Sequence, residues 1–356
     1  MKRIFAMLLC LCMVVALVAC NTPSNDPVEK DYKLGMGVVV SFDSSKTGNA
    51  QVDATVATVV TDADGKIVAC RIDVAQNKMD VTDGAVDTAA TFKTKMEKGD
   101  EYGMAGKVDN DGNGVMKEWY EQTKAFEAYV VGKTVAEVEA IETKEANGHQ
   151  IAVDQALLDA GCSMEITDFI AAVVKACKDE QGMSFKTASE FTLGVAANTT
   201  AEESTAATAD ADGVVKMYTD FAATVVVDGK IVAAINDAIQ PDITINTAGE
   251  IVSSTYKDGT KRERKEAYNM AQFGQNMDNN GDGKVLEWYL QSAEFSKFVV
   301  GKTAAEVEAM ATQTLENDFG TTGYIISADD ALLSAGCTIQ INSIKAVVAE
   351  AVKNAR

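Results

Sequence analysis

Three segments near the start of the mature chain show partial alternation of apolar and polar residues. Residues 34–43 and 52–62 are rich in Val and Thr, and β-branched residues in this pattern are typical of strands. Asp64 and Gly65 form a hairpin turn signal that leads into a third such segment, residues 66–74. The pattern therefore predicts three successive strands.

Helical spacing replaces this alternation further along the chain. Apolar residues recur on one stripe over 116–131, and Gly132 follows where a C-terminal cap is expected. Thr134 opens a capping box and a short helix. A last helix is predicted at about 168–178, with a partner at about 343–353. Strands followed by helices favour an α+β fold with a mostly antiparallel sheet.

This order of elements occurs twice, because the second half of the sequence repeats the first. We therefore predict two copies of one α+β unit, residues 34–182 and residues 183–356, with each long enough to bury its own core. The segments that match by eye are 64–69 with 228–233, 117–140 with 286–309, and 154–162 with 329–337.

The N-terminal residues indicate export. Residues 1–20 begin with two basic side chains and continue with an apolar run, 4–19, which is too short to span a bilayer comfortably. Residues 17–20, Leu-Val-Ala-Cys, resemble the lipobox of bacterial lipoproteins, so Cys20 is the expected lipidation site. An ordinary signal peptide is the alternative. Residues 21–33 are polar and contain two prolines, as in a flexible tether. We expect a lipid-anchored protein of the cell membrane that faces the extracytoplasmic side.

The formal net charge is −21, which repels nucleic acid and anionic headgroups and attracts cations. Nucleic acid is therefore not an expected partner. Four cysteines remain after Cys20. Cys162 and Cys337 occupy matching places in the repeat, whereas Cys70 and Cys177 occur only in the first copy. A Cys70–Cys177 disulfide and two buried thiols are both open alternatives in an exported protein.

A polar loop with the opening pattern of a calcium-binding EF-hand precedes the Trp-bearing helix in each copy. Such loops need oxygen ligands at positions 1, 3 and 5, Gly at position 6 and a carbonyl at position 7. Position 12, normally a bidentate Glu, is Tyr120 or Tyr289, and a Glu stands two places earlier. The alternative is a polar turn that only starts a helix. The candidate ligands are Asp109, Asp111, Asn113, the Val115 carbonyl and Glu118 in the first copy, and Asp278, Asn280, Asp282, the Lys284 carbonyl and Glu287 in the second.

A turn of small residues precedes the last helix of each copy: Ala-Gly-Cys-Ser-Met at 160–164 and Ala-Gly-Cys-Thr-Ile at 335–339. Together with the Asp-Gly-Lys-Ile hairpin and the Trp helix that ends near Gly-Lys, it resembles the FMN-binding domain family. In that family a Thr in a Ser-Gly-Ala-Thr turn is esterified through the FMN phosphate by a flavin transferase. The resemblance therefore assigns to the cofactor Gly161 and Ser163 in the first copy and Gly336 and Thr338 in the second.

The turns depart from the family pattern, because Ala replaces its Ser and Cys replaces its Ala in both copies. A hydroxyl at a glycine turn just ahead of a helix would place a phosphate near exposed N–H groups. Retention of the fold without flavin is the alternative.

These observations support two hypotheses. The first is a membrane-tethered redox module of FMN-binding type that passes electrons to redox partner proteins and does not transform a substrate. The second is a calcium-binding cell-surface lipoprotein with a structural or binding role. A solute receptor of a transporter also remains open. No catalytic residues are predicted, since the single histidine, His149, has no plausible nucleophile beside it.

Overall fold

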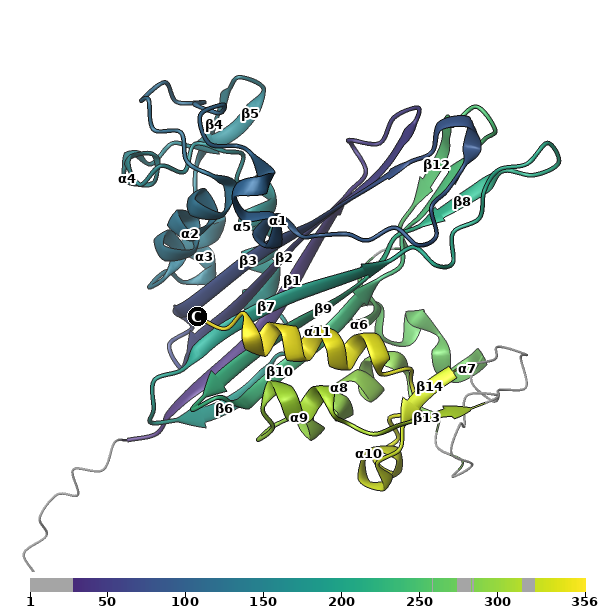
Figure 1. Ribbon diagram of the computed structural model, residues 1–356. Helices are drawn as coiled ribbons and strands as arrows, with labels where there is room; N and C mark the ends of the chain where they lie inside the picture. The colour runs from purple at the N-terminus through teal and green to yellow at the C-terminus, as the bar shows by residue number, and fades with distance from the viewer. Residues whose placement is uncertain (1–27, 258, 274–282, 284, 316–323) are drawn as a thin grey trace, which may run out of the picture.

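The computed structural model describes residues 28–257, 259–273, 283, 285–315 and 324–356. Its antiparallel sheets and packed helices confirm the predicted α+β class. Figure 1 shows the long strands at the centre of the molecule, with helices of the first copy on one side and helices of the second copy on the other. Cys20 and the predicted signal and tether up to residue 27 lie outside the described residues.

The first sheet contains β1 (Lys30–Ser41), β2 (Asn49–Asp62), β3 (Ile67–Asp80) and β6 (Met183–Thr187). Its strand order is β3-β2-β1-β6, and neighbouring strands are antiparallel. The three predicted strands are present; β1 starts four residues earlier and ends two residues earlier than predicted, β2 starts three residues earlier, and β3 ends six residues later. Strand β6 follows the predicted end of the first copy at residue 182, and it nevertheless pairs with β1 of that copy.

The second copy divides its strands between two sheets. The order β10-β9-β7 joins β7 (Thr192–Thr200), β9 (Tyr218–Val227) and β10 (Lys230–Ile239). A smaller sheet follows the order β12-β11-β8, and its strands are β8 (Gly213–Lys216), β11 (Asp242–Ile245) and β12 (Ile251–Thr255). Pro241 separates β10 from β11, because proline has no N–H for the ladder.

Most helical segments follow the same order in both copies, and a short hairpin interrupts each series. The hairpins, 3-10 turns and shortest helices were not predicted. In the first copy the elements are η1 (Thr82–Gly84), α1 (Lys95–Lys98), η2 (Gly99–Tyr102), α2 (Trp119–Val130), α3 (Val135–Glu139), β4 (Thr143–Ala146), β5 (His149–Ala152), α4 (Gln155–Asp159) and α5 (Thr167–Cys177). In the second copy they are α6 (Lys261–Arg264), η3 (Lys265–Tyr268), α7 (Met270–Phe273), α8 (Trp288–Phe298), α9 (Ala304–Glu308), β13 (Thr312–Leu315), β14 (Tyr324–Ser327), α10 (Asp330–Ser334) and α11 (Asn342–Lys353).

The two copies share one apolar core between their sheets. Leu34 and Val56 of the first copy and Phe221 and Val225 of the second belong to the same cluster of buried side chains. Strand β3 lies beside β7, and β6 lies beside β10. On the far side of this core, the helices of the first copy cover the β3-β2-β1-β6 sheet, and helices of the second copy cover the β10-β9-β7 sheet. Three apolar clusters therefore stack in sequence, and the central one belongs to both copies.

Glycines let the last helix of each copy lie directly on its sheet. A Cβ atom at Gly35 would stand 2.1 Å from the Ala176 carbonyl oxygen of α5, and one at Gly194 would stand 1.8 Å from the Ala351 carbonyl oxygen of α11. Both distances are far below van der Waals contact. Any larger residue at these two positions would therefore force α5 or α11 off the sheet.

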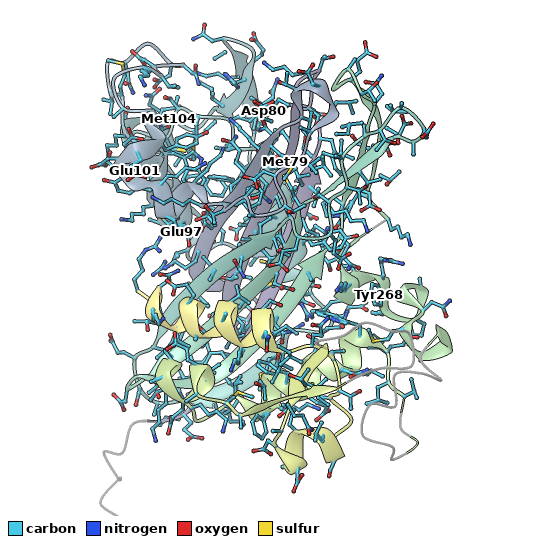
Figure 2. All side chains as sticks on the ribbon, turned by 45° about the vertical axis from the view of Figure 1, so that its right-hand side comes forward. Met79, Asp80, Glu97, Glu101, Met104 and Tyr268 are labelled. Atoms are coloured by element: carbon cyan, nitrogen blue, oxygen red, sulfur yellow. The ribbon has the colours of Figure 1, made fainter. Side chains whose placement is uncertain are left out.

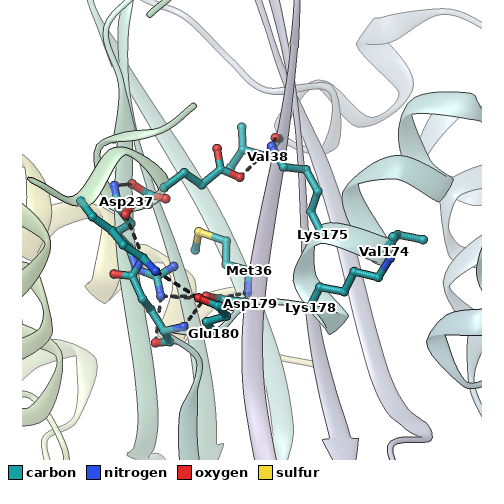
Figure 3. Close-up of a pocket in the computed structure, with 12 residues that line it drawn as sticks. Met36, Val38, Val174, Lys175, Lys178, Asp179, Glu180 and Asp237 are labelled. Atoms are coloured by element: carbon teal, nitrogen blue, oxygen red, sulfur yellow. Dashed lines mark hydrogen bonds and ion pairs between the residues drawn. The ribbon is translucent and has the colours of Figure 1, made fainter. Parts of the chain in front are cut away.

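A buried ion pair also joins the copies. Arg262 of α6 and Asp179, just beyond α5, have side chains only 7% and 8% exposed, and Arg262 Nη2 lies 3.2 Å from Asp179 Oδ2. The same guanidinium donates to the Gln181 carbonyl, and the Arg262 amide donates to Asp237. Figure 3 shows Asp179 and Asp237 on opposite sides of this network. The amides of Met36 and Gln181 also donate to the Asp179 carboxylate.

We expect Arg262→Met to lower the free energy of unfolding by about 3–5 kcal/mol, because Asp179 would stay buried without its cation. The double variant Arg262→Met/Asp179→Asn should lose clearly less, since it removes both charges. Urea denaturation of the mature chain measures both values. Lys186→Met, which breaks the exposed pair with Asp31, is the control and should cost at most about 1 kcal/mol. An equal loss in the single and double variants would contradict the buried-charge explanation.

Candidate functional site

The turn that precedes α5 is fixed to α2 by one glutamine. Gln122 Oε1 accepts hydrogen bonds from the amides of Ser163 and Met164, both at 3.0 Å, and its Nε2 donates to the Lys117 carbonyl. Asn110 Nδ2 donates to the Ser163 carbonyl at 2.9 Å. The candidate attachment residue is therefore held between the Trp helix and the candidate calcium loop.

The second copy uses the same device. Gln291 Oε1 accepts from the Thr338 amide at 2.8 Å and from the Thr338 hydroxyl at 3.3 Å, and Gln291 Nε2 donates to the Leu286 carbonyl. Gly161 and Gly336 have φ values of +87° and +92°, a conformation that favours glycine. The two turns are thus equivalent in backbone and in anchoring.

The two hydroxyls differ in their surroundings, although both are buried. Ser163 is 1% exposed, and its Oγ has no hydrogen-bond partner among the described residues. Thr338 is 2% exposed, and its hydroxyl bonds to Gln291. The prediction placed these hydroxyls beside exposed amides at a helix end. In the structure α5 begins only at Thr167, and Gln122 already occupies the turn amides.

A cavity of about 510 Å³ lies next to the Ser163 turn, and we call it the first pocket. Met164, the next residue in the chain, and Asn110, which bonds to the Ser163 carbonyl, both line it. Its volume is typical of small-molecule sites. The walls of the first pocket include Asp53, Gln76, Tyr102, Met104, Trp119 and Phe169.

A second cavity, of about 340 Å³, occupies the corresponding place in the other copy, and we call it the second pocket. Three of its lining residues match the first pocket through the internal repeat. The pairs are Gln76 with Gln240, Tyr102 with Tyr268, and Met104 with Met270. Figure 2 shows Met104 and Tyr268 on opposite sides of the central strands. The duplication has therefore produced two related pockets far apart on the molecule.

A lysine lies against two aromatic rings beside each of these sites. Lys95 Nζ is 5.2 Å from the Tyr102 ring centre and 5.5 Å from the ring centre of Trp119. Lys261 has the same relation to its own Tyr and Trp, at 5.4 and 5.2 Å. Cation–π contacts of this length are favourable. They fix the position of the Tyr ring that lines each pocket.

A buried aspartate supports the short helix that carries this lysine. Asp73 Oδ1 accepts from the amides of Val74 and Met96. The Thr94 hydroxyl also bonds to it, and Thr94 caps α1. Burial raises the pKa of Asp73 to about 6, against the opposing effect of these hydrogen bonds. Asp73 thus connects α1 to strand β3 through a carboxyl group whose pKa lies well above the ordinary value.

The second copy repeats this arrangement with Asp237, Thr260 and α6. Burial raises the pKa of Asp237 to about 6, while the Arg262 charge and the Thr260 hydroxyl oppose the shift. These aspartates were missed from the sequence. The repeated Thr-Lys-x-Glu capping boxes at 94–97 and 260–263 were the available signal.

The candidate calcium loop of the first copy forms a closed set of hydrogen bonds. Asp109 accepts from the amides of Asn113 and Gly114 at 3.1 and 3.0 Å, and Asp111 Oδ2 accepts from the Asn113 side chain at 2.7 Å. Asp111 Oδ1 is buried without a partner among the described residues. Burial and the neighbouring Asp109 carboxyl raise the pKa of Asp111. Two carboxyl groups thus face each other, which favours a proton or a cation between them.

Other predicted ligands are not brought to this loop. Glu118 accepts from the amides of Met104 and Ala105, and Glu287 accepts from the equivalent amides of Met270 and Ala271. Their role as calcium ligands therefore gains no support from this geometry. Within the described ranges no three acidic, His or Cys side chains converge on one point. The predicted ligands Asp278, Asn280, Asp282 and Lys284 lie outside the described residues, and the Val115 amide donates to Asn113.

The remaining polar candidates have ordinary settings. His149 is half exposed and lies 3.3 Å from Glu165. Cys70 and Cys177 are free thiols in this structure, as are Cys162 and Cys337. In the part of the chain that the structure describes, no helix combines the length and apolar character needed to cross a bilayer.

Fold and sites together define a duplicated α+β protein in which each copy carries a related pocket. No protein-family model and no solved structure match the chain. It is 33% identical over 156 residues to a protein named chlorophenol reductase from Desulfitobacterium hafniense. That match covers 38% of this chain and 46% of the relative, so the chain spans less than half of that protein. The similarity connects the chain distantly with a protein named for a redox reaction.

The raised pKa of Asp73 predicts how the stability of the protein depends on pH. A carboxyl group whose pKa is higher in the folded state favours folding at low pH, and this contribution is lost as the pH rises through about 6. Relative to the parent, Asp73→Asn should therefore gain stability between pH 4 and pH 7, by roughly 2 kcal/mol. Denaturant unfolding at several pH values measures the difference.

Asp80→Asn is the matched control, because the Thr82 hydroxyl and amide hold the pKa of the exposed Asp80 below its usual value. Its contribution has the opposite sign, so this variant should lose a little stability as the pH rises. A pH-independent difference for Asp73→Asn would refute the assigned titration.

The facing carboxyl groups of the loop predict a response to calcium. A cation that binds only the native state raises the unfolding midpoint. Calcium should therefore raise the midpoint relative to chelator, and Asp109→Ala or Asp278→Ala should each remove part of the shift. Glu29→Ala, far from the loops in sequence, is the control. Equal midpoints with calcium and with chelator would count against both loops.

Proposed function

We propose that the protein is an extracytoplasmic electron-transfer module, anchored by a lipid on Cys20, that holds FMN in its first copy and transforms no substrate itself. The order of motifs resembles the FMN-binding domain family, and the distant relative carries the name of a reductase. The single observation that carries the proposal is the first pocket, which adjoins the turn that the resemblance assigns to the flavin.

The residues of the first copy fit such a cofactor in two respects. The unpartnered Ser163 Oγ is a buried polar atom without the bond it would normally require. Tyr102, Trp119 and Phe169 provide aromatic walls for a planar ring system in a cavity of sufficient volume. Bound FMN would supply the redox chemistry that the side chains of this chain lack.

The protein's own part in this function is to position the cofactor and to exclude water. Gln122 holds the Ser163 turn, and Asn110 joins it to the loop that covers it. Because Ser163 is buried, attachment requires that the covering loop move away from the turn. Opening of the bond between Asn110 and the Ser163 carbonyl is the smallest such change.

The fit is poorer in the second copy. The Thr338 hydroxyl already bonds to Gln291, and the neighbouring second pocket is smaller. We therefore assign the flavin to the first copy alone. Redox proteins outside the membrane would be the donor and acceptor of its electrons.

A calcium-binding lipoprotein without redox function is the second candidate. It is favoured by the facing carboxyl groups of Asp109 and Asp111, which attract a cation irrespective of any flavin. The two candidates make different predictions about visible absorption and covalent mass.

We expect the mature protein, co-expressed with a flavin transferase, to absorb visible light and to gain the mass of one FMN less one water, because an ester bond forms. Ser163→Ala should abolish the added mass because it removes the hydroxyl to which the proposal assigns the ester. Thr338→Val is the matched control from the other copy and should retain it. Intact mass and the visible spectrum are the measurements.

Reconstitution of the purified protein with free FMN provides a second arm. Ser163→Ala should still bind FMN reversibly if the first pocket accepts the ring, which fluorescence quenching would detect. A colourless protein of unmodified mass that also fails to bind free FMN would refute the redox proposal and leave the calcium-binding candidate.

A further inference from the structure

The second pocket lies where the strands of the second copy are interrupted. Strand β10 ends at Ile239 and β11 resumes at Asp242, with Pro241 between them. Strand β9 begins at Tyr218 after β8 ends. In the first copy the corresponding strands β2 and β3 run without a break. The interruption therefore creates a set of wall residues that the first pocket does not have.

The two pockets carry opposite charge. The first is lined by four acids, Asp43, Asp53, Glu165 and Asp168, and by Lys95 and the titratable His149. Among the described residues, the second is lined by two cations, Lys257 and Arg264, and by one acid, Asp242. In a chain with a net charge of −21, which repels anions in general, a locally basic pocket is a selective feature.

Several hydrogen-bond donors of the second pocket remain available to a ligand. Lys257 is exposed and forms no ion pair with any described residue. One Arg264 nitrogen donates to the Ala267 carbonyl, which leaves the other N–H groups of the guanidinium. The Tyr268 hydroxyl donates to Gln240 Oε1 at 3.1 Å, so the amide N–H groups of Gln240 stay free to donate.

The remaining walls are aromatic and apolar. The Arg264 guanidinium lies 5.0 Å from the Tyr268 ring centre, and that contact holds both groups at the pocket. Tyr218 donates its hydroxyl to Asp242 at 3.2 Å, which engages the one acid among the described lining residues. Met270 adds a thioether surface. The volume of about 340 Å³ suits a single-ring molecule.

We propose that the second pocket binds a small aromatic anion, a carboxylate or a phenolate, between Lys257, Arg264 and the ring of Tyr218. Arg264 pairs with the planar anionic group, because guanidinium and carboxylate geometries match. Lys257 adds a point charge, and the aromatic walls contact the ring of the ligand. This site is separate from the flavin site and does not depend on it.

Benzoate is the probe, titrated calorimetrically into the mature full chain at fixed ionic strength. The parent should bind it saturably. Lys257→Gln and Arg264→Gln should each weaken binding at least about tenfold, as expected for the loss of one charge-assisted hydrogen bond. Lys98→Gln is the matched control, because Lys98 occupies the place of Arg264 in the first copy, and it should leave the affinity unchanged.

Two comparison ligands test the chemical class. Benzyl alcohol has the ring without the charge, and inorganic phosphate has charge without a ring, so both should bind at least about tenfold more weakly than benzoate. Lys257 is exposed, so Lys257→Gln should fold even if Arg264→Gln does not. Absence of saturable benzoate binding, equal affinity in Lys257→Gln, or phosphate binding as tight as benzoate would overturn the proposal.

Discussion

The apolar core between the two sheets is the constraint on which the rest of the structure depends. The β3-β2-β1-β6 and β10-β9-β7 sheets each have one face covered by the helices of their own copy, and their other faces meet in this shared core. A single copy would therefore expose side chains such as Leu34, Val56 or Phe221 to water, at roughly 25 cal/mol per Å² of apolar surface. The copies fold as one body for this reason, and β6, which completes the first sheet, begins just after the predicted boundary between them.

This shared core leaves only the outer faces and strand ends free to diverge. The features closest to the sheets are the same in both copies: a glycine under the last helix, a glutamine that holds the preceding turn, and a buried aspartate that supports the short helix. Differences appear farther out. Pro241 breaks a strand in the second copy, and the pocket beside that break is basic where its counterpart is acidic. Because both copies share the core, their sequences differ mainly at the strand ends and on the outer faces.

Much of the fold could be predicted, because strands β1 to β3 and helices α2, α5 and α11 leave apolar patterns in the sequence, and the Asp64-Gly65 turn and Gly132 mark two of their ends. The sites were less predictable because tertiary contacts decide them. Nothing near Ser163 in the sequence indicates that Gln122, 41 positions away, occupies its amide. Glu118 resembles a misplaced loop ligand until the structure shows it bonded to the amides of Met104 and Ala105. Short-range patterns cannot identify such long-range partners.

The unequal state of the two candidate hydroxyls follows from a difference of one methyl group. Thr338 and Ser163 stand in equivalent turns, but the methyl group of threonine restricts χ1, and the Thr338 hydroxyl bonds to the glutamine that already anchors its amide. Ser163 lacks that restriction, and its hydroxyl is left without a partner among the described residues. The copy with serine therefore has a hydroxyl oxygen without a described partner, and this oxygen lies in the turn beside the larger pocket. In the copy with threonine, the hydroxyl has a hydrogen-bond partner. The two turns therefore differ in the bonding of one hydroxyl, although their glycines have nearly the same φ.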